Sequence, residues 1–409
     1  MFNLNIVTLQ NETIKHHYPL LQFKAIGAMK IVYVIASLET SGGTERIISE
    51  KANYLADVFG YDVSIICYGQ RTDSTNFYNI SEKINQIYFG LQPYLQYQYK
   101  YPKRIWEKFL FRSRLKKMLS STVNKINPDI LIGITHFRAD FVCDIDCKAK
   151  IIIESHIPRT FIEKTYDSNN LLVNFYKKLY DRRYFNIIEK RADIIITLTE
   201  GDHKKWTKAK QILTIPNFSN IHVHKIYDYR NKRVITIGRL FKEKGFDRLL
   251  DIWKSINDKH PDWQLDIYGD GVLKENLEHK IKSDKITNAK LRGITNNISK
   301  ELSNSSICVA TSYYEGFSLV LLEAIKHGIP CIAFDCPYGP RTIIEDGKNG
   351  FLIEDGNISL YVEKLCTLIE CEQLRQQFSK ASIEKSKLFD TTKIMSQWKK
   401  LFEDILISE

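Results

Sequence analysis

Residues 30–67 have the sequence KIVYVIASLETSGGTERIISEKANYLADVFGYDVSIIC, and this stretch decides the fold. The apolar run 30–35 is rich in β-branched residues, the segment 44–59 has apolar residues at helical spacing, and 62–67 is a second apolar run. A strand, a helix and a strand in this order form a right-handed crossover between parallel strands. Because both runs are mainly apolar and their apolar residues do not alternate regularly with polar ones, we expect the sheet to be buried on both faces.

The same alternation continues along the chain and then starts again. A further helix is predicted at 246–258, and further strands are predicted at 129–133, 150–154, 193–197, 233–238, 263–268, 306–310 and 330–334. An irregular segment that follows Ile215-Pro216-Asn217 separates the two series. The sequence therefore predicts the α/β class, with two doubly wound Rossmann-like domains that face a cleft, because ligands bind beyond the carboxyl ends of such strands.

The predicted domain limits follow from this pattern. We expect 29–222 and 391–409 to form the N-terminal domain and 225–390 to form the C-terminal domain. The segment 391–407 has apolar residues at helical spacing, so one of its faces is expected to pack on protein. Residues 1–28 lack the apolar core of a signal peptide and are expected to be a disordered lead-in, or an extension of a chain that starts naturally at Met29.

Composition limits the classes of function. The chain has 409 residues, a hydrophobic content of 44% and a net charge of +11, which favours anionic partners and argues against disorder. No run of about 18 apolar residues predicts a transmembrane helix. The eight cysteines form no C-x-x-C pair, which is typical of reduced, buried thiols in a cytoplasmic protein.

The strongest motif for chemistry is TSYYEGFSLVLLEAIKHGIP, residues 311–330. Ser318 is expected to cap a helix that begins just beyond the carboxyl end of a strand, which is a geometry that binds phosphate. Glu315 lies before the helix and Glu323 lies inside it, where their carboxylates can accept hydrogen bonds from sugar and ribose hydroxyls. The alternative for this pattern is a helix with two solvated glutamates.

A second motif, Gly238-Arg239-Leu240 through Lys244-Gly245, follows the first strand of the second half. Gly238 permits a close backbone approach, and Arg239 and Lys244 can both reach one phosphate group. Two fixed cations could neutralise a departing diphosphate without a metal. The alternative is a solvated basic turn.

Candidates in the first half are weaker. Gly42, Gly43 and Thr44 lie in a glycine-rich loop before a predicted helix, but the loop has neither a dinucleotide fingerprint nor a P-loop lysine. Other candidates lie just beyond strands in the cleft region, and they are His136, His156 and Arg159. A tight turn and solvated loop histidines explain the same residues equally well.

Together these motifs resemble the family 4 retaining glycosyltransferases of the GT-B fold. The resemblance spans about 30–390 and is most specific within 233–354, where it includes the GRL…KG loop, YGDG, the Glu315…Glu323 motif and EDGKNGF at 345–351. It implies that the N-terminal domain binds the acceptor and the C-terminal domain binds the nucleotide sugar. It also implies that the C-terminal helix crosses back onto the N-terminal domain.

The resemblance also implies roles for single residues. Arg239 and Lys244 would bind the donor diphosphate beside Gly238, Glu315 would contact the donor sugar, and Glu323 would contact the ribose. The remaining donor contacts would come from Gly42, Gly43, Gly293, Ile294, Gly316, Phe317, Ser318 and Leu319. The residues expected to act in catalysis are His156, Arg239, Lys244 and Glu315, and those expected to bind the acceptor are Thr44, His136 and Arg159.

The implied reaction is transfer of a hexose or N-acetylhexosamine from a nucleotide diphosphate sugar, here a UDP-sugar, to a glycan or lipid-linked hydroxyl with retention. It belongs to bacterial surface polysaccharide or glycolipid biosynthesis and requires no cofactor and no metal. Asp144-Ile145-Asp146 matches D-x-D, the metal motif of another glycosyltransferase fold, and we interpret this match as chance. The alternatives are a GT-B nucleotide-sugar epimerase or phosphorylase, and a basic nucleic-acid-binding protein.

The basic charge is concentrated in 100–117, where aromatic residues are interleaved with Lys and Arg, and a second such run is 175–185. A basic, aromatic helix is typical of contact with an anionic membrane surface. We therefore expect a cytoplasmic protein that attaches peripherally to the inner face of the plasma membrane. The alternative is a solvated helix face with an aromatic core side. No DNA- or RNA-binding motif is present, so no nucleic-acid partner is expected.

Overall fold

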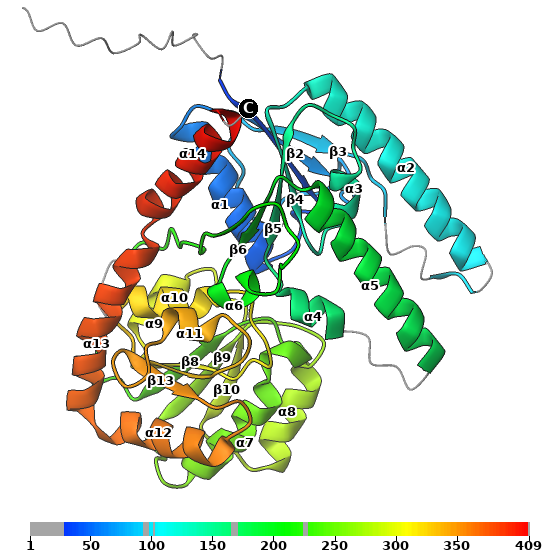
Figure 1. Ribbon diagram of the computed structural model, residues 1–409. Helices are drawn as coiled ribbons and strands as arrows, with labels where there is room; N and C mark the ends of the chain where they lie inside the picture. Colours follow the sequence, from blue (N-terminus) through cyan, green and yellow to red (C-terminus); the bar gives the residue numbers. More distant parts are fainter. Residues whose placement is uncertain (1–27, 93–97, 101–102, 165–170, 224–227, 408–409) are drawn as a thin grey trace, which may run out of the picture.

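The computed structural model describes residues 28–92, 98–100, 103–164, 171–223 and 228–407 (Figure 1). The expected lead-in therefore lies, except for Ala28, outside the described residues. The chain forms two α/β lobes, with the N-terminal lobe at the top of Figure 1 and the C-terminal lobe below it.

The N-terminal lobe is built on a seven-stranded parallel sheet of order β3-β2-β1-β4-β5-β6-β7. Its elements are β1 (Lys30–Ile35), α1 (Gly43–Asp57), β2 (Asp62–Cys67), β3 (Asn85–Tyr88), α2 (Lys103–Ile126), β4 (Ile130–Ile134), α3 (Ala139–Cys143), β5 (Lys150–Ser155), α4 (Arg159–Lys164), α5 (Leu171–Arg191), β6 (Ile194–Thr197), α6 (Glu200–His203) and β7 (Ile212–Thr214). The strands predicted in this half are confirmed to within one residue at each end, and the short edge strands β3 and β7 were not predicted.

The C-terminal lobe repeats this arrangement with a six-stranded parallel sheet of order β10-β9-β8-β11-β12-β13. Its elements are β8 (Arg233–Ile237), η2 (Lys242–Lys244), α7 (Phe246–Asn257), β9 (Gln264–Tyr268), α8 (Lys274–Ser283), β10 (Ala289–Gly293), α9 (Ile298–Ser303), β11 (Ile307–Ala310), α10 (Leu319–Lys326), β12 (Cys331–Phe334), α11 (Pro340–Ile343), β13 (Gly350–Ile353), α12 (Ile358–Glu370), α13 (Glu372–Ser386) and η3 (Lys387–Phe389), and they are followed by α14 (Thr391–Ile407). Both sheets have the order of a doubly wound fold, so the predicted fold class is confirmed.

The continuous apolar runs bury both faces of each sheet, as predicted. In β1, Ile31 and Tyr33 belong to the core cluster that contains α1, whereas Val32 and Val34 belong to a second cluster with residues of α2 and α5. Successive side chains of a strand point to opposite faces, so an apolar strand of this kind needs a helical layer on each side.

The last helix, α14, leaves the C-terminal lobe and packs on the N-terminal one (Figure 1). Its apolar stripe joins the core cluster of β1 and α1, and the buried members are Ile394, Met395, Trp398, Leu401, Phe402 and Ile405. The predicted crossing of the C-terminal helix is therefore confirmed, and the N-terminal lobe is made of two separate pieces of the chain.

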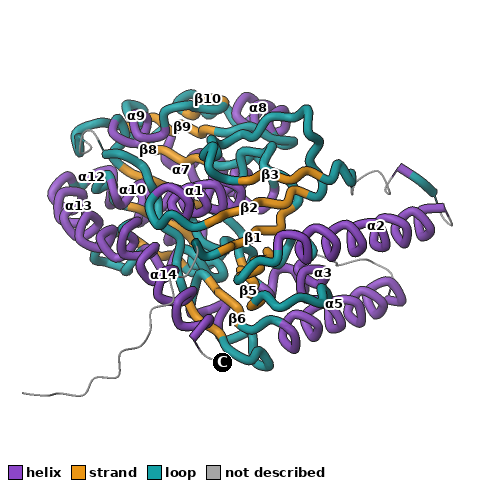
Figure 2. Tube along the Cα trace, turned by 90° about the horizontal axis from the view of Figure 1, so that it is seen from above, coloured by secondary structure: helices purple, strands orange, loops and turns teal. Residues whose placement is uncertain are grey.

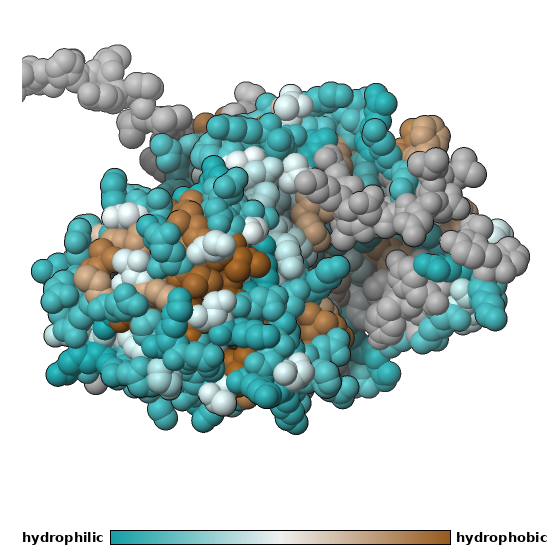
Figure 3. Space-filling model, turned by 90° about the horizontal axis from the view of Figure 1, so that it is seen from below, coloured by the Kyte–Doolittle hydropathy of each residue, from teal (hydrophilic) through white to brown (hydrophobic). Residues whose placement is uncertain are grey.

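Helices α2 and α5 run side by side along the outer side of the N-terminal lobe in both views (Figures 1 and 2). No helix within the described residues is long and apolar enough to span a bilayer. Seen from below, the surface is mostly hydrophilic, with a group of apolar residues over the C-terminal lobe (Figure 3).

Candidate active site

A cleft between the two lobes contains two adjoining cavities of about 470 and 490 Å³. Both are lined by residues of α1 and of the loop that follows β8, and they share Arg46, Tyr78, Gly238 and Arg239. The cleft therefore lies where the carboxyl ends of the two sheets face each other, as the doubly wound fold predicts.

Nearly all residues predicted for the site line the first cavity. These residues are Gly42, Gly43, Thr44, His136, His156, Gly238, Arg239, Lys244, Glu315, Gly316, Phe317, Ser318, Leu319 and Glu323. Ile294 lines the second cavity, whereas Gly293 ends β10 and is not among the residues that line either one.

Two helix N-termini meet in this cleft. Helix α1 begins at Gly43 and α10 begins at Leu319, and a Cβ atom added to Gly43 would lie 3.3 Å from Leu319 Cδ1. Ser318 occupies the N-cap position of α10 as predicted, but its Oγ makes no capping bond and is buried without a hydrogen-bond partner among the described residues. Unpaired amides and the positive ends of two helix dipoles favour a phosphate group between the lobes.

Lys244 and Glu315 form the charged centre of the C-terminal side. Lys244 Nζ lies 2.7 Å from Glu315 Oε1, and Ser312 Oγ donates to the same carboxylate oxygen at 2.7 Å. Arg239 is more open, with an exposed side-chain fraction of 53% and a 3.3 Å contact to Glu243. Lys244 is therefore the more closely held of the two cations, whereas the exposed Arg239 has a longer contact to a carboxylate.

Glu323 has a partner that the sequence did not indicate. Its carboxylate is buried and lies 2.6 Å from Arg46 Nη1, which reaches across the cleft from α1. Burial raises the pKa of the Glu323 carboxyl even though the Arg46 guanidinium opposes this shift. Arg46 also contacts Glu50 at 2.8 Å, one helical turn away, so its spacing in the sequence indicated only a pair on the surface of a helix.

The lobes touch directly at His156. A Cβ atom added to Gly316 would lie 2.0 Å from the carbonyl oxygen of His156, so only glycine allows the loop before α10 to approach this closely. His156 lines the cavity at this point of contact. The close approach places an imidazole of the N-terminal lobe beside the Glu315 loop of the C-terminal lobe.

Arg159, predicted to bind the acceptor, is not among the residues that line either cavity. Its guanidinium lies 2.8 Å from Glu189 Oε1 and packs 4.6 Å from the ring centroid of Phe185. The side chain therefore ties the start of α4 to α5 inside the N-terminal lobe.

His136 lines the cavity and is partly exposed. Its Nδ1 is buried and has no hydrogen-bond partner among the described residues. Burial lowers the pKa of the His136 imidazole to about 3, with smaller effects from the neighbouring His156 and Arg239. His136 is therefore neutral at physiological pH.

This neutral histidine predicts a pH-dependent stability. Between pH 6.5, the pKa of an unperturbed histidine, and pH 3, His136 is protonated in the unfolded chain but not in the folded protein. The free energy of unfolding is therefore highest above pH 6.5 and decreases as the pH falls toward 3. Urea titrations at pH 7 and pH 5 measure how much the free energy of unfolding decreases between the two pH values. This decrease should be about 2 kcal/mol smaller in His136→Asn than in the wild type. His279→Asn, at an exposed position of α8, should follow the wild type. An unchanged pH slope in His136→Asn would show that His136 binds a proton as readily in the folded protein as in the unfolded chain.

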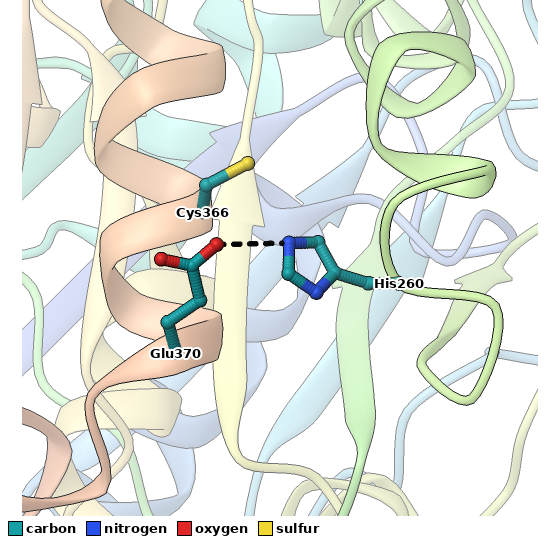
Figure 4. A group of neighbouring side chains, drawn as sticks. All are labelled: His260, Cys366 and Glu370. Atoms are coloured by element: carbon teal, nitrogen blue, oxygen red, sulfur yellow. Dashed lines mark ion pairs between the residues drawn. The ribbon is translucent and has the colours of Figure 1, made fainter.

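Other groups with metal-binding side chains lie away from the cleft. Asp144 of the D-x-D match is paired with Lys116 and Arg191. Among the described residues, His260, Cys366 and Glu370 have their donor atoms within 4.8 Å of one another (Figure 4). Glu370 is 63% exposed and lies 3.2 Å from His260 Nε2, so an ion pair between α12 and the segment after α7 accounts for this cluster.

Comparison with known proteins gives consistent matches over the chain. A family model described as glycosyl transferases group 1 matches residues 220–385. An uncharacterized glycosyltransferase of Haemophilus influenzae is 32% identical over 380 residues, which are 90% of this chain and 99% of the relative. The amylovoran biosynthesis glycosyltransferase AmsD of Erwinia amylovora is 28% identical over 385 residues, which are 90% of this chain and 98% of the relative.

Among solved structures, TarM of Staphylococcus aureus, in complex with fondaparinux, α-GlcNAc-glycerol and UDP, superimposes with a TM-score of 0.73. The two chains are 18% identical, and the match covers 91% of this chain and 99% of that one. At this identity the likeness shows the fold, which is GT-B as predicted.

Proposed function

Because the chain belongs to the group 1 glycosyltransferases, we propose that it transfers a hexose or N-acetylhexosamine from a UDP-sugar to a hydroxyl of a glycan or lipid-linked acceptor. The observation that carries this proposal is the cleft in which Lys244, Arg239 and the N-termini of α1 and α10 surround Glu315. AmsD is named for amylovoran biosynthesis, and TarM is complexed with UDP and α-GlcNAc-glycerol. These names support a role in bacterial surface polysaccharide or glycolipid biosynthesis.

The diphosphate of the donor is the group that the positive part of the cleft fits. Lys244, Arg239 and the amides at the start of α10 would bind it and stabilise the charge that develops as the sugar leaves. Such a set of donors supplies the electrostatic stabilisation for the leaving group from the protein itself. We therefore propose that transfer requires no metal.

The two glutamates would bind the two other parts of the donor, which are the transferred sugar and the ribose. Glu315 would accept hydrogen bonds from the transferred sugar, and Glu323 would accept them from the ribose hydroxyls beside Arg46. Both carboxylates are already engaged by cations, so neither is a free nucleophile, and we propose that the acceptor hydroxyl attacks the face that the leaving group departs from. The expected product therefore keeps the anomeric configuration of the donor.

The test is a screen of nucleotide sugars with the purified full chain, in which donor hydrolysis and transfer to glycan or lipid-linked acceptors are measured separately. Transfer with retained configuration, observed by NMR of the product, is the expected result. Release of free sugar or of an epimer without any transfer would favour an epimerase instead. Full turnover in both Glu315→Ala and Arg239→Ala would show that the reaction takes place elsewhere.

We further propose that α2 and α5 bring the enzyme to the inner face of the plasma membrane, where a lipid-linked acceptor is presented. The two helices lie side by side on one side of the N-terminal lobe (Figures 1 and 2). Their large apolar side chains are unusually open, with exposed fractions of 64% for Trp106, 60% for Phe109 and 63% for Phe175. Lysines and arginines surround them, and this combination suits an anionic bilayer surface.

Vesicle binding tests this placement. The double variant Trp106→Ala/Phe109→Ala should bind vesicles of anionic phospholipid at least about tenfold more weakly in co-sedimentation, because insertion of two aromatic rings is lost. Leu388→Ala, which removes an apolar side chain that is 49% exposed in the C-terminal lobe, is the matched control and should bind like the wild type. Equal binding of the double variant and the control would exclude the two helices as the contact.

A further inference from the structure

A buried chain of three ionisable side chains leads to the cavity through the N-terminal lobe. Lys51 of α1 lies within hydrogen-bonding distance of both carboxylate oxygens of Glu154 in β5, and Glu154 Oε2 lies 2.8 Å from His156 Nε2. Lys51 and Glu154 are each 1% exposed, and His156 is 6% exposed. Only His156 of these three lines the cavity.

The Lys51–Glu154 contact is an ion pair. Burial lowers the pKa of the Lys51 ammonium, but this group faces both carboxylate oxygens of Glu154 and lies 3.9 Å from the ring centroid of Trp398 in α14, and these contacts favour its charged form. Burial alone would raise the pKa of the Glu154 carboxyl, but Lys51 and His156 outweigh it and hold that pKa below its usual value. Glu154 is therefore ionised and accepts hydrogen bonds only.

The ionised carboxylate decides which nitrogen of His156 carries the proton. Since Glu154 can only accept, His156 Nε2 must donate in the 2.8 Å contact between them. In the neutral imidazole this leaves Nδ1 without a proton, and Nδ1 makes no hydrogen bond to any described residue. The cavity wall at His156 therefore offers a hydrogen-bond acceptor.

We propose that Lys51 and Glu154 are positioning residues that fix His156 in the Nε2-protonated form, so that Nδ1 accepts a hydrogen bond from a hydroxyl group of the substrate. A neutral acceptor suits a sugar hydroxyl and disfavours a phosphate, whose oxygens also only accept. The assignment to a substrate hydroxyl rests on the proposed function. The placement of a proton on His156 Nε2 does not, because it follows from the contact with Glu154 in the unliganded protein.

Trp398 extends this arrangement to the end of the chain. Its ring centroid lies 3.9 Å from Lys51 Nζ, and the Lys51 side chain is 2% exposed, so the ammonium borders an aromatic face there in place of water. The helix that completes the N-terminal core thus also supports the charge that orients the histidine.

The first test measures the histidine itself. In ¹⁵N-histidine NMR of the unliganded protein, the resonances lost in His156→Gln identify His156, and a protonated Nε2 with a bare Nδ1 is expected near neutral pH. In Lys51→Met the buried Glu154 loses its counter-charge and takes up a proton, so it can donate to Nε2 and the proton of His156 moves to Nδ1. Lys51→Arg should keep the wild-type tautomer, as should Lys254→Met at an exposed site in α7.

A wild-type His156 with its proton on Nδ1 overturns the proposal without any variant, and so does an unchanged tautomer in a folded Lys51→Met. If Lys51→Met does not fold, the wild-type spectrum and Lys51→Arg still decide the matter. None of these spectra requires a substrate, so a failure to find a donor sugar would leave this test intact.

The second test measures coupling in turnover. Lys51→Met should lower kcat/KM by about 10- to 100-fold, by analogy with the loss of a group that orients a metal-ligating histidine in metalloenzymes. The double variant Lys51→Met/His156→Gln should be no slower than His156→Gln alone, because Lys51 acts only through that imidazole. If the loss in kcat/KM of the double variant equals the product of the losses of the two single variants, Lys51 has a merely structural role, which contradicts the proposal.

Discussion

The Lys244→Met variant is expected to lose about two to three orders of magnitude in kcat, the range found when one fixed donor to a developing negative charge is removed. Lys244 is held 2.7 Å from Glu315 in the cleft, so its charge is in place before the leaving group departs and costs no reorganisation. Its substitution should leave KM for the donor nearly unchanged if the contact strengthens mainly in the transition state.

Lys242→Met is the matched control for this prediction. Lys242 lies in the same η2 turn and is exposed, but it does not line the cavities. Steady-state kinetics should therefore place Lys242→Met close to the wild type. If the kcat of Lys244→Met is within threefold of that of Lys242→Met, Lys244 does not stabilise the leaving group.

The Phe402→Ala variant is expected to destabilise the N-terminal lobe by about 3–5 kcal/mol, the cost of removing a buried aromatic ring. Phe402 is fully buried, packs against Trp398 at 5.5 Å between ring centroids, and belongs to the core cluster of β1 and α1. The loss should appear as a lower denaturant midpoint for that lobe, although the substitution is made at the opposite end of the chain.

Ile407→Ala provides the control on the same helix, because Ile407 is 79% exposed at the end of α14. Its stability should lie within about 0.5 kcal/mol of the wild type. If the two variants unfold at the same denaturant concentration, α14 contributes no more than a surface contact.

Most of the fold could be predicted because parallel strands that are buried on both faces have continuous runs of apolar residues in their sequences. Strands β1, β2, β8 and β12 have this form and were found with their limits nearly correct. The edge strands β3, β7, β10 and β13 were missed because they are short and only partly buried, so their sequences do not differ from loops.

The sequence likewise identified some residues of the candidate site and missed others. Residues in loops at the carboxyl ends of strands were identified, because the fold brings all such ends to one cleft. Position in a loop does not fix where a side chain points, so His156 lines the cavity whereas Arg159, three residues later, turns inward to Glu189. Arg46 and Lys51 escaped detection because their partners, Glu323 and Glu154, are far away in sequence.

The return of α14 also bears on synthesis and on recombination between relatives. The residues of α14 that complete the N-terminal core are synthesised after the C-terminal lobe, so the N-terminal lobe, although its first strand is made earlier, finishes folding only after the C-terminal lobe exists. An exchange of the C-terminal lobe between related genes therefore needs two crossovers, one on each side of that lobe. A single crossover would replace α14 as well, so the N-terminal core of one parent would be combined with the α14 helix of the other.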